Sequence, residues 1–135
     1  MAEFVLNDRL AADTVAVAEW PLSAVRLMND RTWPWLILVP RRPGLRELHD
    51  LSTLDLALLV GEIAKASRAM SEICRPDKVN IGALGNIVQQ LHIHVIGRFR
   101  SDPAWPGPVW SFSPAVPYRD DELPLVLERL GSALT

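Results

Sequence analysis

The stretch Gln90-Leu91-His92-Ile93-His94-Val95-Ile96 is the part of the sequence that says most about how the chain folds. Side chains on a β-strand alternate between the two faces of a sheet. His92 and His94 therefore share one face with Gln90, while the intervening apolar residues share the other. The sequence has three histidines in all, and two of them lie here. The pattern predicts a strand with one face in the core and one face available for chemistry.

Length and composition favour an ordinary globular protein. The 135 residues are 49% hydrophobic and 22% charged, which suits a single domain over residues 1–135 with its own core. A formal net charge of -2 argues against bulk binding of nucleic acid. The sequence starts without a signal-like segment, and no apolar run is long enough to cross a bilayer. The single cysteine, Cys74, is compatible with a reducing compartment, so we expect a cytoplasmic protein with no membrane association.

Several segments have the composition of strands. Residues 14–19 and 23–28 predict a hairpin, and the uniformly apolar residues 35–39, stopped by Pro40, predict a central strand. Residues 78–83 predict a fourth strand, which leads through a glycine-containing loop into the histidine strand.

Two helices are expected. Ser52-Thr53-Leu54-Asp55 is similar to a capping box and predicts a long helix to about Ile73. Its expected apolar stripe consists of Leu54, Leu58, Leu59, Ile63 and Met70. Residues 120–133 predict a second helix near the C-terminus, with Pro124 in its first turn. Together these segments predict an α+β fold with an antiparallel sheet of about five strands.

Between the histidine strand and the last helix, prolines alternate with large aromatic residues. Residues 101–118 contain five prolines together with Trp105, Trp110 and Phe112. Such a segment cannot form regular structure, yet it carries a large apolar surface. We expect an ordered arm that lies on the fold or on a partner, where Trp105 and Trp110 either close a pocket or simply pack.

Three interpretations of His92 and His94 remain open from spacing alone. A neutral imidazole can attack phosphorus when one ring nitrogen donates to a fixed acceptor, and a second imidazole can then assist. Alternatively, two histidines at this spacing can bind a metal, although a third ligand is needed and none is visible nearby. Both can also be structural polar residues.

Residues around the histidines favour phosphate chemistry. Asn80, Gly85 and Asn86 precede them, and glycine-bearing turns let backbone N–H groups approach an anion. Arg98 and Arg100 follow, where they can pair with phosphates. Each residue also has a structural explanation, because glycines turn hairpins and arginines are commonly solvated.

The motif resembles that of the histidine-triad (HIT) superfamily of nucleotide hydrolases and transferases, in a Q-x-H-x-H variant. Gly85-Asn86-Ile87-Val88 is similar to the family's phosphate-binding stretch, and Asn80-Ile81-Gly82 is similar to its Asn-x-Gly. Upstream, residues 33–40 resemble the strand that follows a nucleotide-contacting asparagine, here Asn29. The resemblance covers about residues 14–110.

The resemblance implies a mechanism. His92, as the middle member, is the expected nucleophile toward an α-phosphate, and it would form a nucleotidyl-histidine intermediate. His94 and loop amides would stabilise the phosphoryl oxygens, with Gln90 as the third member of the catalytic set. The residues expected to bind the nucleotide and its phosphates are Asn29, Asn80, Gly85, Asn86, Arg98 and Trp105. No metal or cofactor is implied, and a homodimer that pairs helices and a strand is expected.

Three positions depart from the family pattern. Gln90 replaces the first histidine, Trp35 stands where the family has an additional histidine, and Ile87 replaces a Ser or Thr. We therefore expect a nucleotide phosphohydrolase or nucleotidyl transferase that acts on a nucleotide or dinucleotide polyphosphate or a phosphoramidate. The alternative is a nucleotide-binding or scaffolding protein with little or no turnover.

Overall fold

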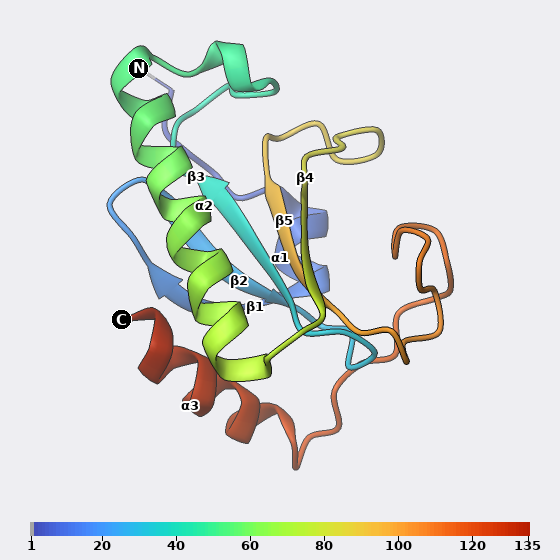
Figure 1. The fold of residues 1–135 in the computed structure, drawn as a ribbon. Coiled ribbons are helices and arrows are strands. Elements are labelled where there is room, and N and C mark those ends of the chain that lie inside the picture. Colours follow the sequence, from blue (N-terminus) through green and yellow to red (C-terminus); the bar gives the residue numbers. More distant parts are fainter. Residues whose placement is uncertain (1) are drawn as a thin grey trace.

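The computed structural model describes residues 2–135, which form an antiparallel sheet covered by helices (Figure 1). The strands lie side by side in the order β1-β2-β3-β5-β4. Their bounds are Thr14–Glu19 (β1), Ser23–Met28 (β2), Trp35–Pro40 (β3), Lys78–Gly82 (β4) and Ile93–Arg98 (β5). This confirms the predicted α+β class with a five-stranded antiparallel sheet.

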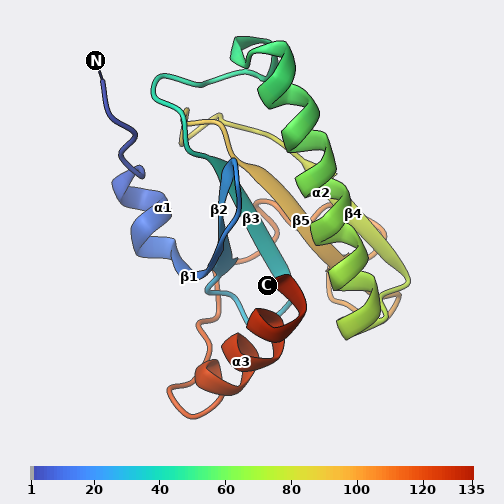
Figure 2. The same cartoon turned by 90° about the vertical axis from the view of Figure 1, so that its left-hand side faces the viewer.

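Three α-helices and a short 3-10 helix complete the fold. They are α1 (Asp8–Asp13), η1 (Leu48–Asp50), α2 (Thr53–Cys74) and α3 (Leu123–Leu134). Helices α2 and α3 lie on one side of the sheet, and α1 lies on the other (Figure 2). Within residues 2–135, no helix has both the length and the apolar character that a bilayer span requires.

Strand β3 is buried on both faces, which explains its uninterrupted apolar sequence. Leu36 and Leu38 belong to the larger core with Leu59 and Met70 of α2. The opposite face of β3 contributes to a second cluster through Trp35, Ile37 and Val39. This cluster also contains Trp33, Leu10 of α1 and Val109 of the arm. The central position predicted for this strand is therefore confirmed, and the second cluster forms the floor beneath the candidate site.

Helix α2 begins and ends close to where the sequence predicts. The Ser52 hydroxyl accepts the N–H of Asp55 as the N-cap, and Arg75 ends the helix with a left-handed φ of 50°. The carboxylate of Asp55 binds Arg42 and so plays no part in a capping box. Leu54 is 72% exposed and Leu58 is also exposed, so these two positions were wrong as core.

Two further boundaries differ from the expectation. Helix α3 begins at Leu123, three residues later than predicted. The N-terminal segment contains α1, for which no helix was expected; the side chain of Asn7 caps it by accepting the N–H of Arg9.

At Gly97, strand β5 lies close to neighbouring side chains, and substitution of this glycine tests the packing. A Cβ there would lie 2.8 Å from Cγ of Pro34 and 3.2 Å from Sδ of Met70. Gly97→Ala should therefore destabilise the protein by about 1–3 kcal/mol, measured as the free energy of unfolding in urea.

Gly61→Ala is the matched control, because Gly61 lies within α2 and a Cβ there would meet open space. Removing glycine from a helix interior should stabilise the protein by about 1 kcal/mol. If both variants shift the urea midpoint in the same direction, the described contact of β5 with Pro34 and Met70 is wrong.

Candidate functional site

The two motif histidines lie beside each other at the start of β5. His94 is within the strand, whereas His92 immediately precedes it, so the strand begins later than the sequence suggests. Both side chains are buried, at 7% and 5% exposure for His92 and His94. Their ring centroids are 4.9 Å apart in an edge-on arrangement.

The protonation of His92 is fixed by the backbone. Its Nδ1 lies 2.7 Å from the carbonyl oxygen of Gln90. A carbonyl can only accept, so Nδ1 carries the proton in this contact and Nε2 keeps its lone pair. This is the tautomer that nucleophilic attack through Nε2 requires.

His94 has the opposite arrangement. The indole N–H of Trp35 donates to Nδ1 of His94 over 2.9 Å. An indole N–H cannot accept, so Nδ1 of His94 is unprotonated and the ring proton lies on Nε2. Burial, and secondarily the neighbouring His92, lower the pKa of His94 to about 3. His94 is therefore neutral over the physiological range of pH.

Both histidines face a cavity of about 610 Å³. Its walls come from α1, the end of β2, strand β3, the loop 84–88 and the arm at 109–117. A volume of this size suits a small organic ligand such as a nucleotide. Of the residues expected to bind the nucleotide, Asn29, Gly85 and Asn86 line this cavity.

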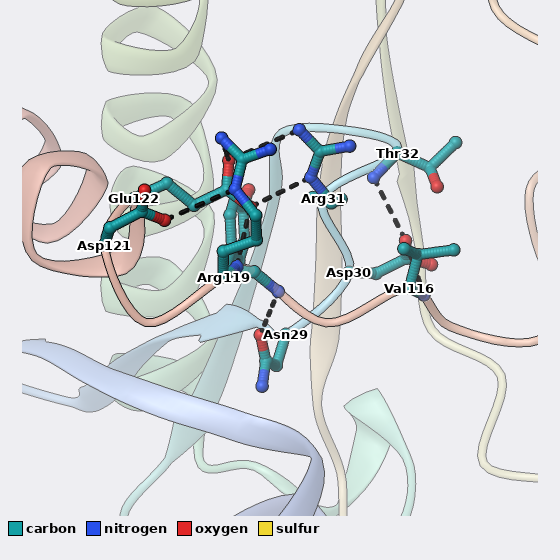
Figure 3. Close-up of polar contacts among 9 residues, drawn as sticks. Asn29, Asp30, Arg31, Thr32, Val116, Arg119, Asp121 and Glu122 are labelled. Carbon is teal, nitrogen blue, oxygen red and sulfur yellow. Dashed lines mark hydrogen bonds and ion pairs between the residues drawn. The ribbon is translucent and has the colours of Figure 1, made fainter.

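Polar contacts with the loop after β2 hold the arm in place (Figure 3). The side-chain oxygen of Asn29 accepts the N–H of Tyr118 over 2.9 Å, and Oδ1 of Asp30 accepts the N–H of Val116 over 3.3 Å. Arg31 pairs with Glu122 at 2.9 Å. Asn29 therefore both lines the cavity and fixes one of its walls.

Gln90 does not join the histidines in this cavity. Its Oε1 accepts the N–H of Asn7 over 2.8 Å, and its Nε2 donates to the carbonyl of Val5 over 2.9 Å. The side-chain amide thus pairs with the N-terminal segment much as a neighbouring strand would. Gln90 borders a smaller adjoining cavity that shares His92 with the larger one.

At the end of β5, the buried Arg98 forms a separate cluster with Asn80 and Trp105, which are half-buried. Arg98 makes two hydrogen bonds to Asp102, at 2.9 and 3.1 Å, and donates to Asn80 at 2.8 Å. The ring centroid of Trp105 lies 5.8 Å from Cζ of the Arg98 guanidinium. None of these three is among the residues that line the large cavity. The structure therefore corrects their expected contact with phosphate, because a phosphate would have to displace a buried carboxylate.

Asp102 is held in its charged form within this cluster. Burial opposes ionisation, but the Arg98 guanidinium and the N–H groups of Phe99 and Ala104 outweigh it and lower the pKa of Asp102. The pair therefore anchors the start of the arm.

Two further residues shape the cavity: Trp110, which was expected either to close a pocket or to pack, and Arg9, which no expectation named. The ring of Trp110 lies edge-on to His94 at 5.4 Å, and it fits there because Gly82 has no side chain: a Cβ would lie 3.0 Å from Trp110. Helix α1 supplies Arg9 to the cavity wall. The Asn7-Asp8 pair is a helix-start signal that could have revealed α1 from the sequence.

The metal interpretation lacks a third ligand. Across residues 2–135, no group of three or more His, Cys, Asp or Glu side chains is placed to hold an ion.

Gln90→Ala tests the contact with the N-terminal segment. Losing the acceptor for the Asn7 N–H should cost about 1 kcal/mol and speed hydrogen exchange at that amide about fivefold. Exchange measured by NMR reports this amide directly. Gln89→Ala, which alters the exposed neighbouring residue, should leave the rate unchanged. Equal rates in the Gln90 variant and the unmodified protein would contradict the contact.

Comparisons with known proteins point to a single family. The HIT domain family model matches residues 9–101. The fold superposes on a histidine triad (HIT) protein from Sinorhizobium meliloti with a TM-score of 0.94 and 45% identity, covering 97% of each chain. A histidine triad protein from Marinobacter aquaeolei gives a TM-score of 0.96 and 47% identity, covering 98% of this chain and 97% of that one.

A curated relative is similar over a shorter segment. The AP-4-A phosphorylase of Mycobacterium tuberculosis is 36% identical over 73 residues, which is 50% of this chain and 37% of that protein. The match therefore spans well under half of the curated relative's length. Taken together with the family match and the two structures, these similarities show that the chain belongs to the HIT domain family.

Proposed function

We propose that this protein acts on a nucleotide or dinucleotide polyphosphate, or on a phosphoramidate, through nucleophilic attack by Nε2 of His92 on the α-phosphorus. The observation that carries the proposal is the hydrogen bond between Nδ1 of His92 and the carbonyl of Gln90. It leaves the lone pair of Nε2 available on a ring that lines a cavity large enough for a nucleotide.

The reaction has two steps. The Nε2 lone pair forms a bond to phosphorus while the bond to the leaving group breaks, and the leaving group takes the electron pair. The resulting nucleotidyl-histidine is then attacked by an acceptor, which restores the imidazole. Water as acceptor makes the protein a hydrolase, and another nucleophile such as phosphate makes it a transferase.

The remaining parts of the cavity supply binding. Gly85 has a φ of 78°, a conformation that suits glycine, and backbone N–H groups of the loop 84–88 would donate to phosphoryl oxygens. Asn86 and Asn29 supply polar side chains, and His94 supplies a neutral N–H. The nucleoside would lie between the apolar side chains of β3 and the arm.

A second candidate is a nucleotide-binding protein with little turnover. Two observations favour it: Gln90 is engaged by the N-terminal segment, and Nδ1 of His94 is engaged by Trp35. Neither group can relay a proton in this arrangement. Nucleotide binding without bond cleavage over a panel of substrates would support this candidate against the first.

We also propose that the protein works in the cytoplasm as a homodimer. Strand β4 is at the edge of the sheet, and its Ile81 is 48% exposed. Val60 on α2 is 59% exposed. Large exposed apolar side chains on a helix and on an edge strand support an association through these two elements.

Val60→Glu combined with Ile81→Glu tests the dimer. The unmodified protein should sediment with the mass of two chains, and the double variant with the mass of one, because charges would be buried against each other. Leu125→Glu, which alters an exposed leucine on α3, is the control and should remain dimeric. An unmodified protein that is monomeric at all micromolar concentrations would overturn the proposed dimer.

His92→Ala tests the proposed chemistry. The purified protein should release AMP from diadenosine tetraphosphate, a substrate suggested by the name of the mycobacterial relative. The variant should lose at least about a thousandfold in kcat/KM, since the nucleophile is gone. Rapid quenching followed by mass spectrometry should detect adenylylated His92 in the unmodified protein.

Folding and binding provide the control for this experiment. The variant should keep its urea midpoint within about 1 kcal/mol and should still bind AMP, which separates loss of chemistry from loss of structure. Equal rates of AMP release in the variant and the unmodified protein would rule out His92 as the nucleophile.

A further inference from the structure

We infer that Trp35 is a positioning residue that fixes the proton of the neutral His94 on Nε2, so that the site favours leaving groups that depart as stable anions over amines that need a proton. In substrate terms, the site selects the phosphoanhydride bond over the phosphoramidate bond. This inference rests on the proposed function and narrows its substrate class.

The geometry starts from the register of β3 and β5. Ile37 lies opposite His94 and Trp35 lies opposite Ile96, so the Trp35 side chain reaches His94 diagonally across the two strands. The donor and acceptor are 2.9 Å apart. Trp35 is only 7% exposed and packs edge-on against Trp33 at 6.3 Å, which fixes the indole in place.

The surroundings of His94 offer it no other partner for a second proton. His92 and Trp110 face its ring edge-on, at 4.9 and 5.4 Å. Within residues 2–135, the bond to Trp35 is the only hydrogen bond that its ring nitrogens make. Protonating Nδ1 would place two N–H groups against each other in a buried site, and burial already lowers the pKa of His94 to about 3.

The other charged and titratable groups around the cavity are engaged elsewhere. Asp30 is buried and accepts the N–H groups of Thr32 and Val116. Arg9 and Asp13 pair with each other at 3.5 Å on the exposed surface of α1. The Nδ1 proton of His92 is held by the carbonyl of Gln90. None of these groups carries a proton positioned beside His94 for release.

The proton balance then separates two classes of substrate. In a phosphoanhydride, the bond from phosphorus to oxygen breaks, and the electron pair stays on a phosphate oxygen that is stable as an anion in neutral water. In a phosphoramidate, the electron pair goes to nitrogen, which must receive a proton as the bond breaks. His94 could give only its Nε2 proton, which would leave an imidazolate, so the amine departs slowly.

Nitrogen-15 NMR of the histidine rings tests the role of Trp35 without any substrate. In the unmodified protein, His94 should show the Nε2–H tautomer and no titration between pH 5 and pH 8. In Trp35→Phe, the indole donor is lost while His94 stays buried and uncharged, so signals of its Nδ1–H tautomer should appear. Trp20→Phe, which changes a buried tryptophan in the core on the other side of the sheet, is the control and should leave the His94 signals unchanged.

The tautomer and the titration of His94, measured by NMR, decide whether the inference holds. A His94 that carries its proton on Nδ1, or that titrates above pH 5 in the unmodified protein, overturns the inference. Because that measurement uses the unmodified chain, it holds even if Trp35→Phe fails to fold.

Leaving-group selectivity tests the consequence. At pH 7, kcat/KM for diadenosine tetraphosphate should exceed that for adenosine 5′-phosphoramidate by at least about a hundredfold, the lower range of what general acid catalysis contributes. The two substrates share the adenylyl group, so the ratio reports on the leaving group.

Failure of this inference and failure of the proposed function give different results. If both substrates are cleaved with adenylylation of His92, and the phosphoramidate is as fast, the proposed function stands and the inference falls. If neither substrate is cleaved and no adenylylated His92 forms, the proposed function falls and the selectivity claim falls with it.

Discussion

His92 and His94 are neighbours with opposite tautomers, and the rest of the site depends on that difference. The carbonyl of Gln90 accepts from one ring, and the indole of Trp35 donates to the other. Each contact specifies which nitrogen carries the proton, because a carbonyl only accepts and an indole only donates. Burial keeps His94 uncharged, so the two rings, 4.9 Å apart, avoid the repulsion between two imidazolium ions.

The scaffold holds these rings through β5, which is hydrogen bonded on both sides. Strand β3 pairs with one edge of β5 and β4 with the other, so β5 cannot shift without breaking two ladders. At its far end, Arg98 and Asp102 join β5 to the arm through a buried ion pair. The arm is joined to β2 through Asn29 and Asp30. A cavity wall without regular secondary structure is therefore fixed at both ends.

Local pattern in the sequence predicted the elements of this fold well. The apolar run at 35–39 indicated a strand buried on both faces, and Ser52 marked the start of α2. The alternation around His92 and His94 placed both rings on one side. These features depend on how apolar and polar side chains alternate along one helix or strand, and neighbouring residues in the sequence show that alternation directly.

Partners across the fold could not be read in the same way. Gln90 binds residues more than 80 positions earlier, and Trp35 binds a residue 59 positions later. Arg98 was expected to bind phosphate, but it binds Asp102 of the proline-rich arm. The sequence gives no sign that Asp102 folds back onto Arg98. Leu54 and Leu58 follow a helical stripe, yet both are exposed, at 72% and 38%. Such choices depend on tertiary geometry.

Gln90 and Trp35 both reduce the number of groups in the site that can carry a positive charge. The family resemblance places a histidine at each position, and here each is replaced by a side chain that cannot titrate and whose hydrogen bonds stay within the protein. With His94 also neutral, the proposed phosphate binding would depend on backbone N–H groups of the loop 84–88 and on Arg9, all at the cavity wall. Backbone dipoles do not depend on pH and need no reorganisation when charge develops on the phosphoryl oxygens. A site built this way relies on fixed dipoles to hold the phosphoryl group and on the leaving group's own stability to complete the reaction.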